Sequence, residues 1–178
     1  MCDKSGILAK DSEGLNWMQE SMMNVTNLEQ KHGSLADALK GADIFVGVSA
    51  PNIVTAEMVS SMNKDAILFA MANPVPEIMP DVAKAAGAKV VGTGRSDFPN
   101  QVNNVIAFPG IFRGALDVRA SDINDEMMLA ASDAISKLVT EEDLANGIII
   151  PSAFNKGVVE SIAKAVADAA VKSGVARI

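Results

Sequence analysis

The chain has 178 residues, 49% hydrophobic and 21% charged, a balance that excludes a disordered chain and fits one globular domain spanning residues 1–178. Its net charge of −7 has the wrong sign for binding nucleic acid or anionic lipid, and Cys2 alone excludes an internal disulfide or a cysteine metal cluster. No apolar run approaches the roughly 18 residues that cross a bilayer. We therefore expect a cytoplasmic protein that binds neither nucleic acid nor membranes.

The middle of the chain alternates apolar runs with helical patterns. Ser34 and Asp37 stand three residues apart, as in a capping box, and Thr55 can cap the next helix. The apolar run at 44–48 predicts a strand that is buried on both faces. The expected helices cover residues 34–40, 55–62 and 80–86, and the expected strands cover residues 42–48, 66–71 and 88–94. This alternation is typical of a parallel sheet covered by helices.

The C-terminal part of the chain is more helical. Its expected helices cover residues 108–120, 124–139, 140–147 and 160–174, and residues 148–154 are expected to be a short strand or an extended segment. One helix should bury a face that contains Met128, Ala131, Ile135 and Leu138. In the last helix, Ile162, Val166 and Ala169 or Ala170 share one face.

A polar loop follows each expected strand of the middle region. The loop sequences are GVSAPN, ANPVPE and GTGRSDFPNQVNN. Ligands of open parallel sheets bind outside the carboxyl ends of the strands, so these loops predict a ligand site at one edge of the sheet. Asparagine side chains both donate and accept hydrogen bonds, which suits a neutral polar ligand or a carboxylate.

Four long stretches carry a resemblance to a known family. They are ADIFVGVSAPN, FAMANPVPEI, GRSDFPNQVNNVIAFPGIFRGALD and IIIPSAFNKGVVESIAKAVADAA. In this order and at this spacing they resemble the NAD-binding domain of malic enzymes, especially the bacterial type. The resemblance implies a Rossmann-like three-layer α/β/α sandwich with a mostly parallel sheet. It also implies oxidative decarboxylation of malate to pyruvate and CO2, with NAD or NADP and a divalent metal (Mg or Mn) as cofactors.

The resemblance further implies a set of binding residues. Asn73 matches the asparagine that contacts malate and the nicotinamide side of the cofactor. Asn103 and Asn104 match the pair that binds the substrate and the nicotinamide ribose. The loop that passes the cofactor contains Val48, Ser49 and Ala50.

Asp3 resembles the acidic residue that ends the second strand of the fold and binds an adenosine ribose hydroxyl, which favours NAD. The turn DSEG at residues 11–14 departs from the turn usual in the family, so NADP stays open as the alternative.

Each of these residues also has an ordinary structural interpretation. Asn73 precedes Pro74 and could simply form a turn, and Asn103 and Asn104 could cap the helix that follows them. Asp3 could be a solvated residue near the chain end.

For several other polar residues we expect structural roles only. Arg95 and Asp97 fit a salt bridge within a loop. His32 fits a surface loop, since no second histidine or cysteine completes a metal set. Ser49 has no arrangement of His and Asp partners that would make it a nucleophile.

Several parts of the family pattern are missing from the chain. A G-x-G-x-x-G turn should precede Asp3 by roughly 20 residues, but only two residues precede it. In the family, the catalytic tyrosine, the catalytic lysine and the metal ligands lie further upstream, and this chain contains no tyrosine. We therefore expect a truncated domain that lacks the first strand and the Gly-rich turn, with no catalytic residue and no metal ligand of its own.

Two classes of function fit this pattern. In the first, the chain is the cofactor- and substrate-binding half of a malate oxidoreductase, inactive until it joins an N-terminal catalytic half, with malolactic conversion as a related activity. In the second, the chain is a non-catalytic dinucleotide-binding remnant or an interaction module. The missing first strand is normally central, so its loss should expose strand edges and favour a homo-oligomer.

Overall fold

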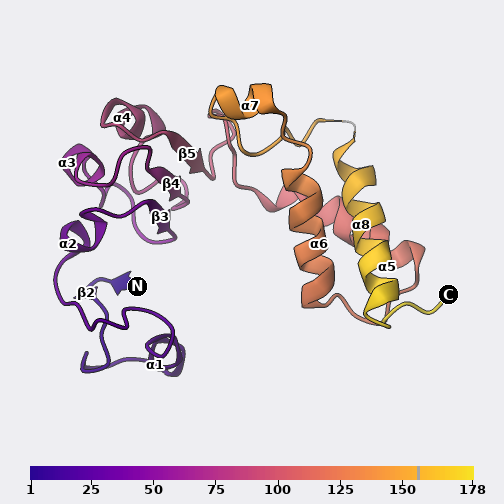
Figure 1. Ribbon diagram of the computed structural model, residues 1–178, viewed down its shortest axis with the longest axis horizontal. Helices are drawn as coiled ribbons and strands as arrows, with labels where there is room; N and C mark the ends of the chain where they lie inside the picture. The colour runs from indigo at the N-terminus through magenta and orange to yellow at the C-terminus, as the bar shows by residue number, and fades with distance from the viewer. Residues whose placement is uncertain (156) are drawn as a thin grey trace.

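The computed structural model describes residues 1–155 and 157–178. A parallel sheet forms the centre of the N-terminal part, with strand order β3, β4, β5 (Figure 1). The strands are β3 (Ile44–Gly47), β4 (Ile67–Ala70) and β5 (Val90–Thr93). This sheet, interleaved with helices, confirms the mixed α/β organisation that the sequence predicts.

Short helices, two of them with side-chain N-caps, precede or connect these strands. They are α2 (Leu35–Leu39), α3 (Ala56–Ser60) and α4 (Pro80–Ala85). Ser34 and Asp37 form both bonds of the expected capping box, and the Thr55 side chain accepts a hydrogen bond from Met58 N. These side chains satisfy backbone groups that a helix end leaves without partners, which explains why the helices begin where they do.

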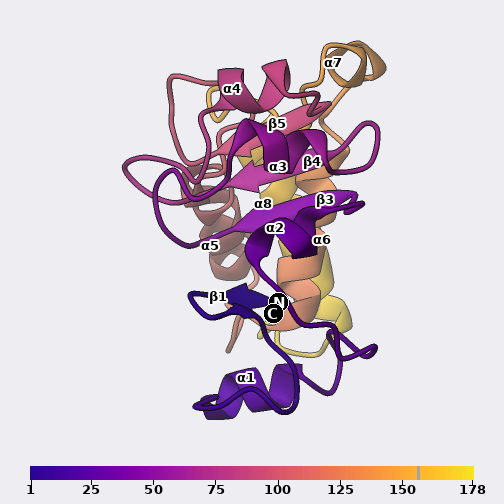
Figure 2. The same cartoon turned by 90° about the vertical axis from the view of Figure 1, so that its left-hand side faces the viewer.

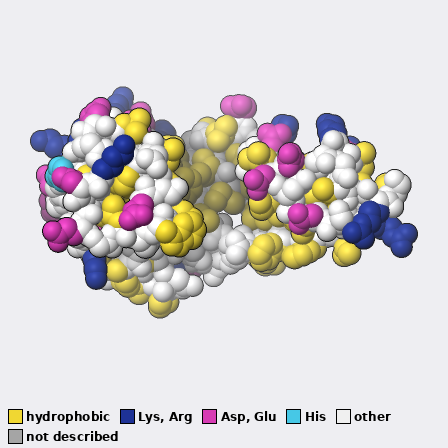
Figure 3. Space-filling view, turned by 90° about the horizontal axis from the view of Figure 1, so that it is seen from below, with side chains coloured by type: hydrophobic (Ala, Val, Ile, Leu, Met, Phe, Trp, Pro, Cys, Tyr) yellow, Lys and Arg dark blue, Asp and Glu magenta, His cyan; other side chains and the backbone are white. Residues whose placement is uncertain are grey.

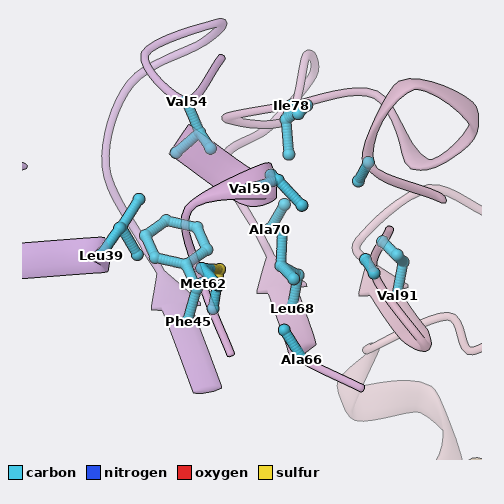
Figure 4. Packing of buried hydrophobic residues seen from close by; sticks show 12 residues of the cluster. Leu39, Phe45, Val54, Val59, Met62, Ala66, Leu68, Ala70, Ile78 and Val91 are labelled. Carbon is cyan, nitrogen blue, oxygen red and sulfur yellow. The ribbon is translucent and has the colours of Figure 1, made fainter. Parts of the chain in front are cut away.

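The sheet and the three helices enclose one hydrophobic cluster. Figure 4 shows Phe45, Leu68 and Val91 from the three strands facing side chains from the helices and loops. Leu68 is completely buried and Val91 is 2% exposed. The cluster therefore fixes the sheet and the helices as one packed unit.

The prediction that residues 44–48 are buried on both faces is wrong. Phe45 is only 7% exposed, whereas Ile44 is 55% and Val46 is 61% exposed. Successive side chains of a strand point to opposite faces, and only the face that carries Phe45 lies against the cluster. Among the described residues, nothing buries the other face of β3.

Helices dominate the C-terminal part and bury a second hydrophobic cluster. Helix α8 (Val158–Lys172) packs against both α5 (Phe108–Asp117) and α6 (Asp125–Ser136), to one side of the sheet in Figure 1. The expected face of α8 is confirmed, because Ile162, Val166 and Ala170 are fully buried.

The expected face of α6 is partly wrong. Met127 is fully buried, whereas Met128 is 49% exposed. The buried face runs through Met127, Ala131 and Ala134, at a spacing of four and then three residues, because this row faces α8. Helix α7 (Glu141–Ala145) begins with the expected capping box of Thr140 and Asp143, and residues 148–154 form no strand.

The first residues form a separate hairpin. Strand β1 (Cys2–Asp3) pairs antiparallel with β2 (Gly6–Ile7), and α1 (Trp17–Met22) follows. Asp3 therefore does not end a strand of the parallel sheet, contrary to expectation. The physical reason is a turn in which its carboxylate accepts a hydrogen bond from Ser5 N at 2.8 Å, which folds the chain back on itself. No helix among the described residues is long and apolar enough to cross a membrane.

The closest helix contact generates a stability prediction. A Cβ at Gly114 of α5 would lie 2.4 Å from the carbonyl oxygen of Ala163 in α8. We expect Gly114→Val to lower the free energy of unfolding by about 1–3 kcal/mol, because the helices must separate. Leu116→Val is the control on the same helix, since Leu116 is 72% exposed. Urea unfolding followed by circular dichroism measures both, and equal stabilities of Gly114→Val and the unsubstituted chain would contradict this packing.

Candidate functional site

The carboxyl ends of the three parallel strands lie side by side. The register pairs Gly47 with Ala70, and Ala70 with Thr93, so the loops that follow the strands start at one edge of the sheet. This arrangement brings together the polar loops that the sequence singles out as a ligand site.

A buried carboxylate joins the first two of these loops. Glu77 is 0% exposed, and its Oε1 accepts hydrogen bonds from Ser49 N at 2.8 Å and from Ser49 Oγ at 2.9 Å. Its Oε2 accepts a hydrogen bond from Ala72 N at 2.9 Å. One side chain therefore holds the backbone that follows β3 and the backbone that follows β4.

The end of β3 is shaped to accept this carboxylate. A Cβ at Gly47 would lie 2.6 Å from Glu77 Oε1, so a glycine is needed where the strand passes Glu77. Beyond this point the loops stay joined by backbone bonds, from Asn52 N to Pro76 O and from Val54 N to Glu77 O, both at 3.0 Å.

Hydrogen bonding keeps Glu77 ionised. Burial by itself raises the pKa of the carboxyl, but the hydrogen bonds from the amides of Ala72 and Ser49 and from the Ser49 hydroxyl outweigh it and leave the pKa below its ordinary value. Within residues 1–155 and 157–178, no lysine or arginine forms an ion pair with it. The charge is therefore balanced by neutral donors.

The predicted residues of the first two loops are exposed beside this carboxylate. Val48 is 79% exposed, and Ser49, Ala50 and Asn73 are also exposed. Asn73 directly follows Ala72 and precedes Pro74 through a cis peptide bond. The structure thus brings the Ser49 segment and the Asn73 segment together, as the prediction of a common site requires.

The predicted residues of the third loop have a structural role as well. The Asn103 side chain accepts a hydrogen bond from Val105 N at 3.0 Å and caps the short helix η1 (Asn104–Ile106), so the ordinary interpretation of Asn103 is confirmed. Both asparagines are exposed. Asn103 also lines a pocket of about 340 Å³ between this loop and the segment at 148–154.

Asn100 is a site residue that sequence reasoning missed. It is 4% exposed and adopts a left-handed φ of 58°. Its amide nitrogen donates to Val91 O at 3.2 Å and to Gly147 O at 2.9 Å, and its amide oxygen accepts from Ile149 N at 2.8 Å. Asn100 therefore fixes the segment that forms one wall of the pocket against the end of β5. Nothing in the local sequence distinguishes it from the other loop asparagines.

Glu77 was also missed, although the sequence contains a signal for it. It is an acidic residue between Pro76 and Ile78 in an otherwise apolar stretch, and both neighbours are buried. An acidic residue at such a position needs hydrogen-bond partners.

Asp3 lies apart from these loops. Its carboxylate accepts hydrogen bonds from Ser5 and from Gln19 Nε2, and the bond to the Ser5 side chain is the main cause that holds the pKa of Asp3 below its ordinary value. Figure 2 shows β1 well away from the layer formed by β4 and β5.

The other polar residues follow their structural interpretations. Arg95 and Asp97 form a two-bonded salt bridge, with Nε to Oδ1 at 2.9 Å, and the His32 side chain is 59% exposed. Among the described residues, no group of three or more His, Cys, Asp or Glu side chains could hold a metal ion. The acidic residues therefore form no candidate metal centre in the described part of the chain.

Comparison with known proteins identifies relatives of this arrangement. The family model "Malic enzyme, NAD binding domain" matches residues 1–173. The "Bifunctional malic/malolactic enzyme" of Bacillus subtilis is 57% identical over 179 residues, covering 100% of this chain and 44% of the relative. The "NAD-dependent malic enzyme" of Geobacillus stearothermophilus is 51% identical over 175 residues, covering 98% of this chain and 36% of the relative.

Solved structures agree with the sequence matches. The malic enzyme from Pyrococcus horikoshii Ot3 superposes with a TM-score of 0.85 at 46% identity, over 96% of this chain and 40% of that structure. The predicted Rossmann-like α/β fold is thereby confirmed. The chain spans less than half the length of these relatives. Because the family model covers almost all of its length, the chain belongs to the malic enzyme family and represents that family's NAD-binding domain.

Proposed function

We propose that the chain supplies the dinucleotide-binding part, and some of the substrate contacts, of an NAD(P)-dependent malate oxidoreductase that converts malate to pyruvate and CO2. The observation that carries the proposal is the pair of loops joined by Glu77 at the carboxyl edge of the sheet, in a chain that matches this NAD-binding domain. Exposed amide and backbone groups there offer both donors and acceptors to a nicotinamide and a carboxylate.

The proposed contacts come from all three loops at the carboxyl edge of the sheet. Ser49 and its neighbours Val48 and Ala50 border the path of the cofactor, and Asn73 faces both nicotinamide and malate. From the third loop, Asn103 contacts the cofactor and the substrate, and Asn104 contacts the substrate. The proposed ribose contact of Asp3 rests on the family resemblance alone, since its carboxylate is already bound by Ser5 and Gln19.

In the proposed function, this chain transfers no proton and binds no metal. Because the described residues contain no cluster fit for Mg or Mn, the residues present do not fit the divalent metal of the family reaction. We propose that the catalytic residues and metal ligands belong to an N-terminal half, which is the partner of residues 1–178. Residues 1–178 form a single domain, which we place in the cytoplasm.

A second candidate activity is malolactic conversion. The Bacillus subtilis relative, at 57% identity, carries both malic and malolactic activity in its name. A non-catalytic binding or interaction module is the alternative from another class. Reading the coding DNA immediately upstream separates the classes: a continuous frame with a G-x-G-x-x-G motif and a tyrosine supports the enzyme, whereas a promoter and start at Met1 supports the module.

The cofactor proposal is tested by titrating the chain with NAD and recording amide chemical shifts by NMR. We expect shifts that cluster at Ser49, Asn73 and Asn103, with a Kd of about 1 mM or weaker, because no Gly-rich turn binds the pyrophosphate. Asn73→Ala should weaken binding about three- to tenfold through one lost hydrogen bond.

The matched control is Asn63→Ala, which removes an exposed asparagine that donates to Asp43 Oδ1 at 2.9 Å, outside the three loops. It should leave NAD binding unchanged. Shifts that spread over the surface, or that spare the loops, would contradict the proposal.

The exposed side of β3 supports a proposed homo-oligomer. Strand β3 ends the order of the sheet, whereas the other end, β5, is bridged by Gln101. Ile44 and Val46 add exposed apolar surface to this unpaired edge. Figure 3 shows hydrophobic side chains between small groups of charged ones on one face of the molecule. Unpaired strand edges favour pairing with another chain.

We expect light scattering coupled to size-exclusion chromatography to show self-association of the chain, and Val46→Lys to reduce it by placing a charge beside the edge. Val171→Lys is the matched control on α8, where Val171 is 54% exposed. A clean monomer at high concentration would overturn this proposal.

A further inference from the structure

Glu77 is a buried acidic group to which the proposed function assigns no contact with a ligand. We propose that Glu77 is a positioning residue, which holds the loop that carries Ser49 and the loop that carries Asn73 in the relative placement that the dinucleotide needs. This inference rests on the proposed function for its ligand, but the loop geometry that it describes exists without the ligand.

The hydrogen bonds between the two loops and the Glu77 carboxylate all run in one direction. All three groups that meet the carboxylate from the two loops are donors: Ser49 N, Ser49 Oγ and Ala72 N. An ionised carboxylate accepts at both oxygens and brings no donor of its own. A glutamine would place an NH2 group against Ser49 N or Ala72 N, so the amide isostere leaves at least one of these backbone N–H groups without its acceptor.

The Glu77 carboxylate lies where the two loops start. It lies next to the aligned ends of β3 and β4, where a Cβ at Gly47 would be 2.6 Å from Oε1. The carbonyl oxygen of Glu77 also accepts a hydrogen bond from Val54 N at 3.0 Å. Glu77 therefore joins the two loops both where they start and near the end of the first loop. The two loops therefore move as one unit.

Glu77 differs in exposure from the loop residues that are proposed to contact the ligand. Glu77 is fully buried, whereas Ser49 and Asn73 are exposed. A ligand in front of the loops touches the exposed residues and not the carboxylate. Glu77 therefore acts on a ligand only through the loops, and its charge is held by neutral donors without a described ion-pair partner.

The test compares the full chain with Glu77→Gln, using amide hydrogen exchange, pH titration and NAD titration, all read by NMR. In Glu77→Gln, we expect exchange at Ser49 or Ala72 to rise about tenfold, because at least one amide loses its acceptor. The NAD-induced shifts at Asn73 should fall by a similar factor at equal NAD concentration.

A pH titration reports whether one carboxylate meets both loops. A lowered pKa means that the stabilising bonds are complete above the ordinary range for glutamate and are lost as the pH falls through the lowered value. In the unsubstituted chain the amide signals of Ser49 and Ala72 should titrate together in that acidic range, although they belong to different loops. In Glu77→Gln this shared titration should be absent.

Two further variants keep the inference open to refutation. Glu57→Gln, at an exposed position in the first turn of α3, is the matched control and should change none of these readouts. Should Glu77→Gln fail to fold, Ser49→Ala removes the hydroxyl donor while the amide of residue 49 keeps its bond to Glu77 Oε1. The shared titration of the amides at positions 49 and 72 should then move to higher pH, because one of the hydrogen bonds that hold the pKa of Glu77 down is lost.

The outcomes separate this inference from the proposed function. Unchanged exchange, titration and NAD response in Glu77→Gln would overturn the positioning role, and so would an unchanged titration in Ser49→Ala should Glu77→Gln not fold. Absence of any NAD response in the unsubstituted chain would overturn the proposed cofactor site, while the exchange and pH readouts would still decide whether Glu77 joins the loops.

Discussion

The hydrogen bonds between a buried carboxylate and two loops determine how the edge of the sheet is built. Without Glu77, the amides of Ser49 and Ala72 would lose the acceptor that they share, and an unpaired donor is costly at a buried residue such as Ala72. The glycine at the end of β3, the adjoining loop bonds and the exposed position of Asn73 all depend on this contact. We propose that a ligand site at this edge is preorganised by a group that the ligand does not touch.

Hydrogen bonds of the Asn100 side chain connect this edge of the sheet to the C-terminal part. Asn100 bonds the end of β5 and the segment at 147–150, and this segment leads on to α8 and its cluster. The pocket beside Asn103 lies between these elements. The segment at 147–150 therefore supports the third loop from one side, while β5 supports it from the other.

Sequence reasoning recovered features that depend on neighbouring residues in the chain. The capping boxes, the buried face of α8 and the gathering of polar loops follow from local spacing. It failed where distant segments decide: Ile44 is exposed because nothing described covers its face, and Asp3 turns back into a hairpin through Ser5. Burial and pairing across the fold are not encoded in local periodicity.

We propose that the loops joined by Glu77, together with the third loop, form one site for a nicotinamide dinucleotide. Intermolecular nuclear Overhauser effects between NAD and the full chain test it most directly. We expect contacts from the nicotinamide protons to the side-chain amides of both Asn73 and Asn103. Contacts confined to one loop, or to surfaces such as the groove between α6 and α8, would contradict it.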